Sequence, residues 1–565
     1  MSEPLTGLGV SPGRVAGPVA RMAAPPALPP PPGFAVGAGA VALAVTALEA
    51  VAADLRRRAA LMAGEAAEVL EAQAMMAADP MLREEAERLA AGNPGAGVGD
   101  GPGVGGVVCG RGGPGDGPEP VSGAAVWAAH ALDRAFARHR AALAELGGYF
   151  AERAADLDDL RNRAVAAALG RPMPGIPAPG RPFVLVAEDL SPADTVTLGP
   201  DVLAVVTERG GPTSHTAILA RARALPAVVA CAGATALADG ELVAVDGTAG
   251  RVTPGLSEEE AETLRRGHDA YRERLRSGGG RGRTADGHAV PLLLNIGSAA
   301  DVRDEDWTSA EGVGLFRTEL LFLDRHAAPA PREQHAAYAE VFARCPKVVV
   351  RTLDAGTDKP LPFLGLDAEP NPALGIRGLR VDRVRPAVLD EQLAAIASAA
   401  ERARAEVWVM APMVATWQEA AAFARRARAA GLRRVGAMVE VPAAALVADR
   451  LLEHLDFLSV GTNDLGQYAF AADRQHPRLA DLLDPRQPAL LRLVAECARA
   501  GLAAGKPVGV CGEAAGDPAV APLLVGLGVS SLSMSAACVP AVREALAGLT
   551  RERCRRAAER AMDPR

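Results

Sequence analysis

The sequence lacks the features that mark secreted, membrane-spanning or nucleic-acid-binding proteins. Its seven cysteines include no C-x-x-C pair, which argues against a disulfide framework or a cysteine zinc site. No segment approaches the roughly 18 consecutive apolar residues of a membrane-spanning helix. The net charge of −8 argues against a nucleic-acid partner or an anionic membrane surface. The start, MSEPLTGLGVSPG, lacks the basic and apolar segments of a secretory signal, so we expect a cytoplasmic protein.

A stretch of glycines, hydroxyl residues and one histidine, GGPTSHTAILAR, occupies residues 210–221. The apolar run before it predicts a buried strand, and the alanine-rich run after it predicts a helix. The two glycines allow a tight turn, and Thr213 and Ser214 are typical of a helix start. His215 would then lie in the first turn, where free N–H groups favour a phosphate and the helix dipole disfavours imidazolium. We therefore expect a neutral, nucleophilic His215; the alternative is a helix-capping turn with a surface histidine.

Helical and β-rich segments surround this corner in the chain. Apolar residues recur at helical spacing over residues 46–89 and 124–169, which predicts a helical bundle. The glycine- and proline-rich tract at residues 92–120 predicts a loop between those helices. Short β-rich runs over residues 181–254 predict an α/β domain around His215.

Beyond about residue 290 the pattern changes to short apolar runs alternating with helical segments. About eight such runs in roughly 260 residues are typical of a (β/α)8 barrel, whose active-site groups lie at the carboxyl ends of the strands. Polar residues stand at those ends in run after run: Arg317, Arg351, Asp354, Glu440, Asn463, Asp464, Cys511, Ser533 and Ser535.

The residue types at these strand ends indicate an anion and a metal ion. Glu440 and Asp464 offer the hard oxygen ligands that suit Mg²⁺, with structural pairing to arginine as the alternative. Arg317, Arg351 and Arg474 offer planar forks for phosphate and carboxylate, and such a cluster of like charges is expected only where an anion binds.

The corner at His215 resembles the phosphohistidine motif of the phosphoenolpyruvate (PEP)-utilising enzymes. Within that group the chain is most similar to the Enzyme I family of the bacterial sugar phosphotransferase system. The barrel region carries the resemblance in EGVGLFRTELLFLDR, VRTLDAGTDKPLPFL, EPNPALGIRGLR, SVGTNDLGQYAFAADR and GVCGEAAGD. The resemblance implies a multidomain α/β protein, with a swivelling α/β phosphohistidine domain that contains an inserted helical bundle, followed by a PEP-binding (β/α)8 barrel.

The same resemblance assigns roles to individual residues. It implies that His215 carries the phosphoryl group and that Cys511, by itself more typical of a buried apolar residue, protonates the enolate of pyruvate. Glu440 and Asp464 would bind Mg²⁺. The implied substrate-binding residues are Arg317, Arg351, Asn463, Asp464 and Arg474, with Arg377 and Lys359 as further candidates.

The resemblance also implies a domain organisation. The α/β domain would occupy residues 1–35 and 149–256, and the helical insert with its loop would occupy residues 36–148. The remaining expected boundaries are a linker helix and hinge at 257–284, the barrel at 285–550 and a C-terminal tail at 551–565.

The implied function is that of a PEP-protein phosphotransferase. The protein would move the phosphoryl group of PEP to His215, release pyruvate, and pass the group to a histidine of the carrier protein HPr. HPr would dock on the helical insert, where Gln73 replaces a histidine of the family, and the barrel would form a homodimer. One alternative is a pyruvate phosphate dikinase or PEP synthase, which needs a nucleotide domain for which the chain has no room. The other is a non-catalytic, regulatory protein that binds PEP or HPr.

Overall fold

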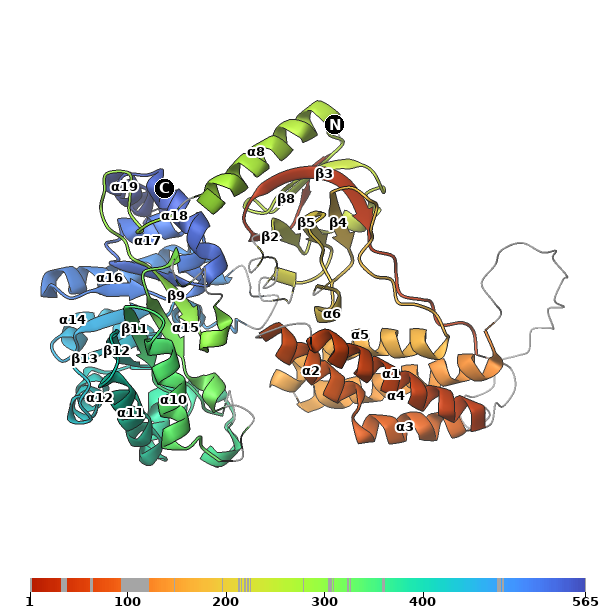
Figure 1. Ribbon diagram of the computed structural model, residues 1–565, viewed down its shortest axis with the longest axis horizontal. Helices are drawn as coiled ribbons and strands as arrows, with labels where there is room; N and C mark the ends of the chain where they lie inside the picture. Colours follow the sequence, from red (N-terminus) through yellow and green to blue (C-terminus); the bar gives the residue numbers. More distant parts are fainter. Residues whose placement is uncertain are drawn as a thin grey trace. The chain divides into compact units, whose positions relative to one another are not determined.

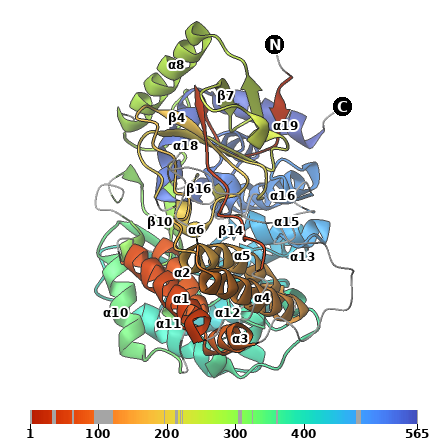
Figure 2. The same ribbon diagram turned by 90° about the vertical axis from the view of Figure 1, so that its right-hand side faces the viewer.

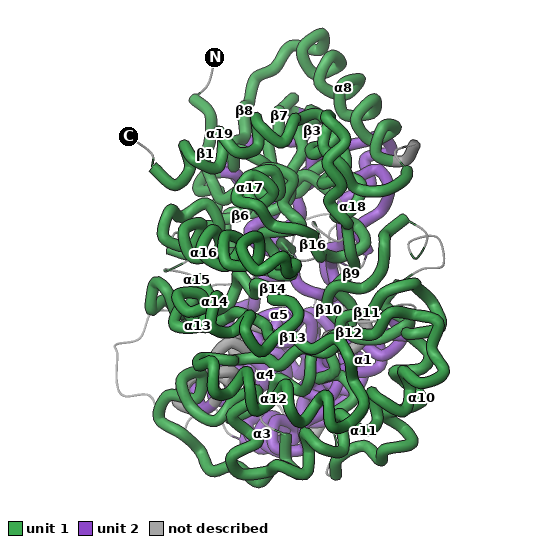
Figure 3. Tube along the Cα trace, turned by 90° about the vertical axis from the view of Figure 1, so that its left-hand side faces the viewer, with its two compact units in different colours: residues 1–17, 203–233, 241–565 green, residues 18–202, 234–240 purple. Residues whose placement is uncertain are grey.

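The computed structural model describes most of the chain. The described residues are 3–31, 38–60, 65–92, 121–146, 148–195, 197–211, 214, 216–217, 220, 223, 225–277, 279–302, 307, 309–322, 325, 327–357, 361–474, 479 and 482–563. His215, Lys359 and the predicted loop beyond Gly92 lie outside them. The chain divides into two compact units (Figure 3), residues 1–17, 203–233 and 241–565, and residues 18–202 and 234–240. No helix of the described chain is long and apolar enough to cross a membrane.

An eight-stranded sheet combines strands from both sides of the helical insert (Figure 1). Its central strands are rich in valine and almost fully buried, as expected of residues that pack well in a sheet. The order of hydrogen-bonded strands is β1-β8-β7-β3-β4-β5-β6-β2. The bounds are β1 (Leu5–Thr6), β2 (Leu8–Ser11), β3 (Arg14–Arg21), β4 (Phe183–Ala187), β5 (Val202–Thr207), β6 (Ala227–Val229), β7 (Leu242–Asp246) and β8 (Arg251–Pro254).

Five long helices form the predicted bundle (Figure 2). They are α1 (Ala38–Ala59), α2 (Glu65–Ala77), α3 (Pro80–Ala91), α4 (Gly123–Leu146) and α5 (Gly148–Ala168), with the short α6 (Pro192–Thr195) after β4. Helix α3 begins where expected, because Asp79 accepts hydrogen bonds from the backbone N–H groups of Met81 and Leu82, and Pro80 stands in the first turn. Leu157 and Leu160 of α5 belong to the core of the bundle. The bundle therefore extends through α5, past the boundary predicted at residue 148.

The second half of the chain is the predicted (β/α)8 barrel. Its parallel strands are β9 (Leu292–Ile296), β10 (Val313–Arg317), β11 (Lys347–Arg351), β12 (Glu406–Ala411), β13 (Arg434–Val439), β14 (Phe457–Val460), β15 (Val508–Val510) and β16 (Ser531–Met534). The barrel closes where β16 pairs with β9, at Leu532 and Leu292. The longer helices around it are α10 (Pro331–Phe342), α11 (Pro386–Ala400), α12 (Trp417–Ala429), α15 (Thr462–Phe470), α16 (Pro488–Ala504) and α18 (Val539–Ala547). The shorter ones are α13 (Pro442–Leu446), α14 (Ala448–Leu452) and α17 (Ala521–Gly526).

Two further helices lie before and after the barrel in the chain. Helix α8 (Glu258–Ser277) matches the predicted linker helix, and Ser257 and Glu260 cap its start by reciprocal hydrogen bonds. Residues 551–565 were expected to form a tail, but they contain helix α19 (Arg551–Met562). Cys554 and Ala558 of α19 are buried against the barrel, so this charged segment is a packed part of the barrel and not a tail.

Candidate active site

The predicted barrel residues lie at the carboxyl ends of the strands or directly after them. Carboxyl ends of parallel barrel strands meet at one end of the barrel, so these side chains share one site. In chain order, they are Arg317 at the end of β10, Arg351 at the end of β11, Glu440 after β13, Asn463 and Asp464 in the first turn of α15, Arg474 beyond α15, and Cys511 after β15.

Arg351 is buried among three carboxylates. Its Nη2 lies 3.2 Å from Oε2 of Glu319, and its Nη1 lies 3.4 Å from both Oδ2 of Asp354 and Oε1 of Glu440. Burial opposes the charged form of Arg351, but the three carboxylates outweigh burial and raise the pKa of the guanidinium. The buried Nε has no hydrogen-bond partner among the described residues. Arg351 therefore retains one donor for a ligand.

Arg377, a further candidate of the resemblance, lies in the same cluster. Its Nε and Nη2 donate to the two carboxylate oxygens of Asp354, each at 3.1 Å. Its Nη1 lies 3.0 Å from Oδ1 of Asp464. Nη1 of Arg474 lies 3.7 Å from Oδ2 of Asp464, so Asp464 connects two arginines.

The pKa of Glu440 is raised, because the neighbouring arginine does not fully offset burial and the charges of nearby carboxylates. Its Oε2 accepts a hydrogen bond of 2.8 Å from the backbone N–H of Met413. Burial, followed by the charges of Asp354 and Asp464, raises the pKa of Glu440 to about 7, although Arg351 acts in the opposite direction. A divalent cation would relieve this repulsion between carboxylates.

The described carboxylates of the site form no dedicated metal cage. Among the described residues, no group of three or more histidine, cysteine, aspartate or glutamate side chains is arranged to hold a metal ion. Mg²⁺ usually takes only one or two protein carboxylates, with water and substrate phosphate as its other ligands. Glu440 and Asp464 are oxygen donors of that kind. In this structure Glu440 is paired with Arg351 and Asp464 with Arg377, which is the structural pairing that the sequence left as the alternative.

Cys511 is buried and keeps its proton. Burial is the main reason that the pKa of the Cys511 thiol rises to about 11, with a smaller opposing effect of Ser459. Its Sγ lies 3.7 Å from the backbone oxygen of Val460. The side chain of Asn295 donates to the backbone oxygen of Cys511 at 2.9 Å and fixes this strand end. Burial therefore favours the protonated form of the Cys511 thiol.

The remaining predicted residues differ in their contacts. Asn463 donates from Nδ2 to Oε1 of Glu513 at 3.2 Å and accepts from the backbone N–H of Glu513 at 3.0 Å. The side chain of Arg317 is exposed at the end of β10. The backbone N–H of Arg474 donates to Gln467, which places this arginine beside α15.

The structure also shows residues that the sequence analysis did not assign to the site. Glu319 pairs with Arg351, and Tyr468 accepts from Nη1 of Arg377 at 3.3 Å while donating to the backbone oxygen of Ala373 at 2.5 Å. The position of Glu319, two residues after Arg317 in the same motif, was the available signal in the sequence.

The corner before His215 has the predicted turn. Gly210 has a φ of +97°, a conformation that favours glycine, and the N–H of Ser214 donates to the backbone oxygen of Gly211. Oγ of Ser214 accepts from the N–H of Ala217 at 3.3 Å, which is the geometry of a helix cap. His215 itself lies outside the described residues.

Three parts of the chain match domains of the PEP-utilising enzymes. Residues 6–96 match the N-terminal domain, residues 179–250 the mobile domain and residues 276–551 the PEP-binding domain. The chain is 50% identical to a phosphoenolpyruvate-protein phosphotransferase of Streptomyces coelicolor, over 99% of this chain and 96% of that protein. Proteins of the same name from Haloferax volcanii and Staphylococcus carnosus are 41% and 39% identical, over 77% and 73% of this chain and 79% and 75% of theirs.

Proposed function

We propose that this chain, which belongs to the PEP-utilising enzymes, transfers the phosphoryl group of PEP to its own His215 and then to a histidine of HPr. The observation that carries the proposal is 50% identity to a phosphoenolpyruvate-protein phosphotransferase over nearly the whole of both chains. The buried cluster of arginines and carboxylates at the carboxyl end of the barrel supplies the chemistry that this transfer needs.

Substrate binding is the first role of the cluster. PEP carries a phosphate and a carboxylate, and planar guanidinium groups bind both. Arg317, Arg351 and Arg474 would hold these anionic groups, and the amide of Asn463 would bind a phosphate oxygen. Arg351 has a buried Nε without a partner in the described chain, which supports its place against the substrate.

The metal ion has a defined place in this proposal. Glu440 and Asp464 would hold one Mg²⁺, which when bound supplies positive charge to the oxygens of the transferring phosphoryl group. Asp464 would also contribute to substrate binding through Arg377 and Arg474, which it holds on either side.

The reaction consists of two steps, phosphoryl transfer to His215 and protonation of the enolate that leaves. Neutral His215 attacks phosphorus, a nitrogen–phosphorus bond forms, and the bond between phosphorus and the enol oxygen breaks. The enolate that leaves takes a proton from the Cys511 thiol at carbon and becomes pyruvate. Solvent then returns a proton to Cys511. Position 215 falls in the match to the mobile domain, residues 179–250, and the barrel falls in the match to the PEP-binding domain, residues 276–551. Turnover would therefore include a movement of the mobile domain.

The corner between α2 and α3 is the proposed docking surface for HPr. Two methionines of the segment EAQAMMAADPML are exposed there, Met75 by 60% and Met81 by 71%. Methionine is common on adaptable binding surfaces, because its side chain is flexible and polarisable. We define Met75 and Met81 as the methionine corner.

The barrel is the proposed dimerisation domain, and we place the enzyme in the cytoplasm. Trp417 of α12 is partly exposed and stacks on His454 with the ring centroids 5.7 Å apart. Leu446 at the end of α13 is 68% exposed. Single exposed apolar side chains are common on protein surfaces, so the dimer is proposed from the family and not from these two residues.

Transfer of label from ³²P-PEP separates this proposal from its alternatives. The purified protein is incubated with labelled PEP and Mg²⁺, first with HPr and then, in place of HPr, with AMP and either pyrophosphate, which a dikinase needs, or inorganic phosphate, which a synthase needs. Label on HPr supports the proposed function. Label in a nucleotide would identify a dikinase or synthase, and a folded protein that takes up no label would be a regulatory binding protein.

A further inference from the structure

A buried glutamine joins two of the barrel strands that carry site residues. Gln392 of α11 has no exposed surface. Its Oε1 accepts a hydrogen bond of 2.9 Å from the backbone N–H of Leu353, just beyond β11. Its Nε2 donates to Oγ1 of Thr318, just beyond β10, at 3.0 Å and to the hydroxyl of Tyr338 at 3.1 Å. Both amide hydrogens and the amide oxygen are therefore used.

The bonds of Gln392 lead directly to the arginines of the site. Thr318 is the neighbour of Arg317 in the chain, and Oγ1 of Thr318 donates to the backbone oxygen of Arg351 at 3.0 Å. Leu353 lies between Arg351 and Asp354 in the chain. One amide thus fixes the end of β10 against the end of β11.

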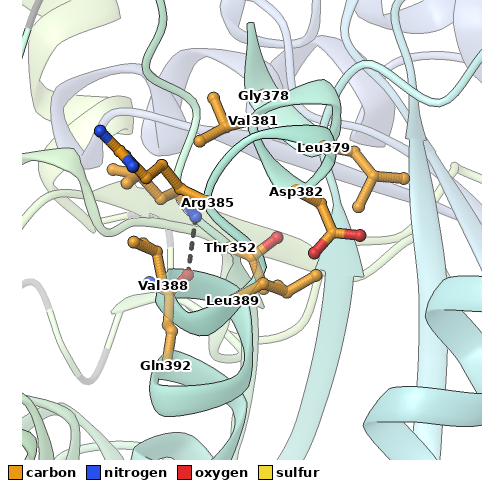
Figure 4. Close-up of a pocket in the computed structure, with 10 residues that line it drawn as sticks. Thr352, Gly378, Leu379, Val381, Asp382, Arg385, Val388, Leu389 and Gln392 are labelled. Atoms are coloured by element: carbon orange, nitrogen blue, oxygen red, sulfur yellow. Dashed lines mark hydrogen bonds between the residues drawn. The ribbon is translucent and has the colours of Figure 1, made fainter. Parts of the chain in front are cut away.

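Gln392 also lies next to segments of the chain that carry two arginines of the site. It lines a small pocket behind the strand end, together with Thr352 and Gly378 (Figure 4). Thr352 follows Arg351 and Gly378 follows Arg377 in the chain, so the pocket is lined by the immediate neighbours of two arginines of the cluster. A buried amide whose hydrogen bonds are all made adds rigidity as well as stability.

A second buried glutamine belongs to the same hydrogen-bond network but bonds to residues outside the site. Gln334 of α10 is also buried, accepts from the hydroxyl of Tyr338 at 3.2 Å and donates to the backbone oxygen of Pro329 at 3.0 Å. Gln334 and Gln392 therefore share Tyr338 as a partner, but only Gln392 bonds to the strand ends.

We propose that Gln392 is a positioning residue for the substrate. Arg317 and Arg351 are the last pair of the ladder between β10 and β11. By holding Thr318 and Leu353 just beyond that pair, Gln392 keeps the two strand ends from separating where the ladder stops, and thereby preserves the fit of the two guanidinium groups to the anionic groups of PEP. The inference rests on the proposed role of those arginines. Glutamine suits this place because one side chain supplies two donors and one acceptor in a plane.

The test compares Gln392→Met with Gln334→Met. Methionine preserves the length of the side chain and removes all amide hydrogen bonds, so both variants lose buried bonds to Tyr338. The measurements are the KM for PEP and the kcat of self-phosphorylation, with the midpoint of thermal unfolding for each full-length protein. We expect Gln392→Met to raise the KM for PEP by about tenfold or more, because small displacements of binding groups are costly. Gln334→Met should lower the unfolding midpoint but leave this KM unchanged.

Two further variants keep the test decisive. Thr318→Val removes the hydroxyl that Gln392 bonds, preserves the shape of the side chain, and should raise the KM for PEP in the same way even if Gln392→Met fails to fold. Arg351→Lys reports on the substrate site itself. A raised KM in Arg351→Lys with an unchanged KM in folded Gln392→Met, or in Thr318→Val, overturns the positioning role. Equal increases in Gln392→Met and Gln334→Met overturn it as well, and an unchanged KM in Arg351→Lys overturns the substrate site together with it.

Discussion

The barrel site and the methionine corner differ in how firmly their side chains are held. In the barrel, Arg351 faces three carboxylates, and Arg377 is bonded to two. At the methionine corner, Met75 and Met81 are exposed and free of such polar constraints. The difference follows from the two tasks: phosphoryl transfer needs charges fixed in advance, whereas docking of a partner protein favours side chains that adapt.

The largest effect should follow from removing a charge from the barrel site. Arg351→Ala leaves Glu319, Asp354 and Glu440 without their shared cation, and it removes a donor to the transferring phosphoryl group. We expect a loss of roughly 10³-fold or more in the rate of self-phosphorylation, measured by rapid quench with labelled PEP. Stability should also fall by about 3–5 kcal/mol, because buried carboxylates lose their partner.

Arg499→Ala is the matched control for this substitution. Arg499 pairs with Glu496 on the surface of α16, and its side chain is 72% exposed. Its loss should leave both rate and stability nearly unchanged. Similar losses of rate and stability in Arg351→Ala and Arg499→Ala would show that the buried cluster has no special role.

A second large effect should come from the proton donor. Cys511→Ala should slow pyruvate formation by about 10²–10⁴-fold, because the enolate loses its acid. A lactate dehydrogenase assay reports pyruvate directly. Cys497→Ala is the control, since Cys497 is a buried cysteine of α16 away from the strand ends. If both variants keep the full rate of pyruvate formation, Cys511 is a core residue only.

The methionine corner should give a smaller effect that is confined to HPr. Replacing both Met75 and Met81 by alanine should raise the KM for HPr by roughly tenfold to a hundredfold, as truncation of apolar interface residues commonly does. Self-phosphorylation by PEP should stay the same. Leu502→Ala, at an exposed leucine of the barrel helix α16, provides the control. An unchanged KM for HPr would place the docking surface elsewhere.

The smallest effect concerns the interior of the helical bundle. Gln73 is fully buried, and neither of its amide atoms has a hydrogen-bond partner in the described chain. Gln73→Leu should therefore raise the free energy of unfolding by about 1 kcal/mol, because an unpaired amide is no longer buried. Urea denaturation measures this change. A destabilised Gln73→Leu would show that the amide has a partner in the folded protein.

The sequence predicted the barrel well, because buried valine-rich runs such as those around Val348–Val350 alternate with helices at a regular spacing. The same regular alternation also predicted which residues stand at the strand ends. The boundary expected at residue 148 falls between α4 and α5, but Leu157 and Leu160 of α5 pack in the same core as α4, so the bundle continues beyond it. Helix α19 escaped prediction because it is highly charged and buries only Cys554 and Ala558.

The contacts within the site could not be read from the chain. Asp354 and Arg377 meet through a long loop between β11 and α11, and Gln392 reaches Thr318 over 74 positions of sequence. The winding of strands and helices around the barrel brings such segments together, and the local sequence patterns do not show which of their side chains will meet. Glu319 is the exception, since it stands in the same motif as Arg317.

The most direct measurement is the site of phosphorylation after incubation with PEP and Mg²⁺ in the absence of nucleotide. Intact-mass and peptide mass spectrometry under neutral conditions would compare the natural protein with His215→Ala and with the folded Arg351→Ala variant. We expect one acid-labile phosphoryl group on His215 of the natural protein, none on His215→Ala, and greatly slowed labelling of Arg351→Ala. A phosphoryl group on another residue, or full labelling of His215→Ala, would contradict the account.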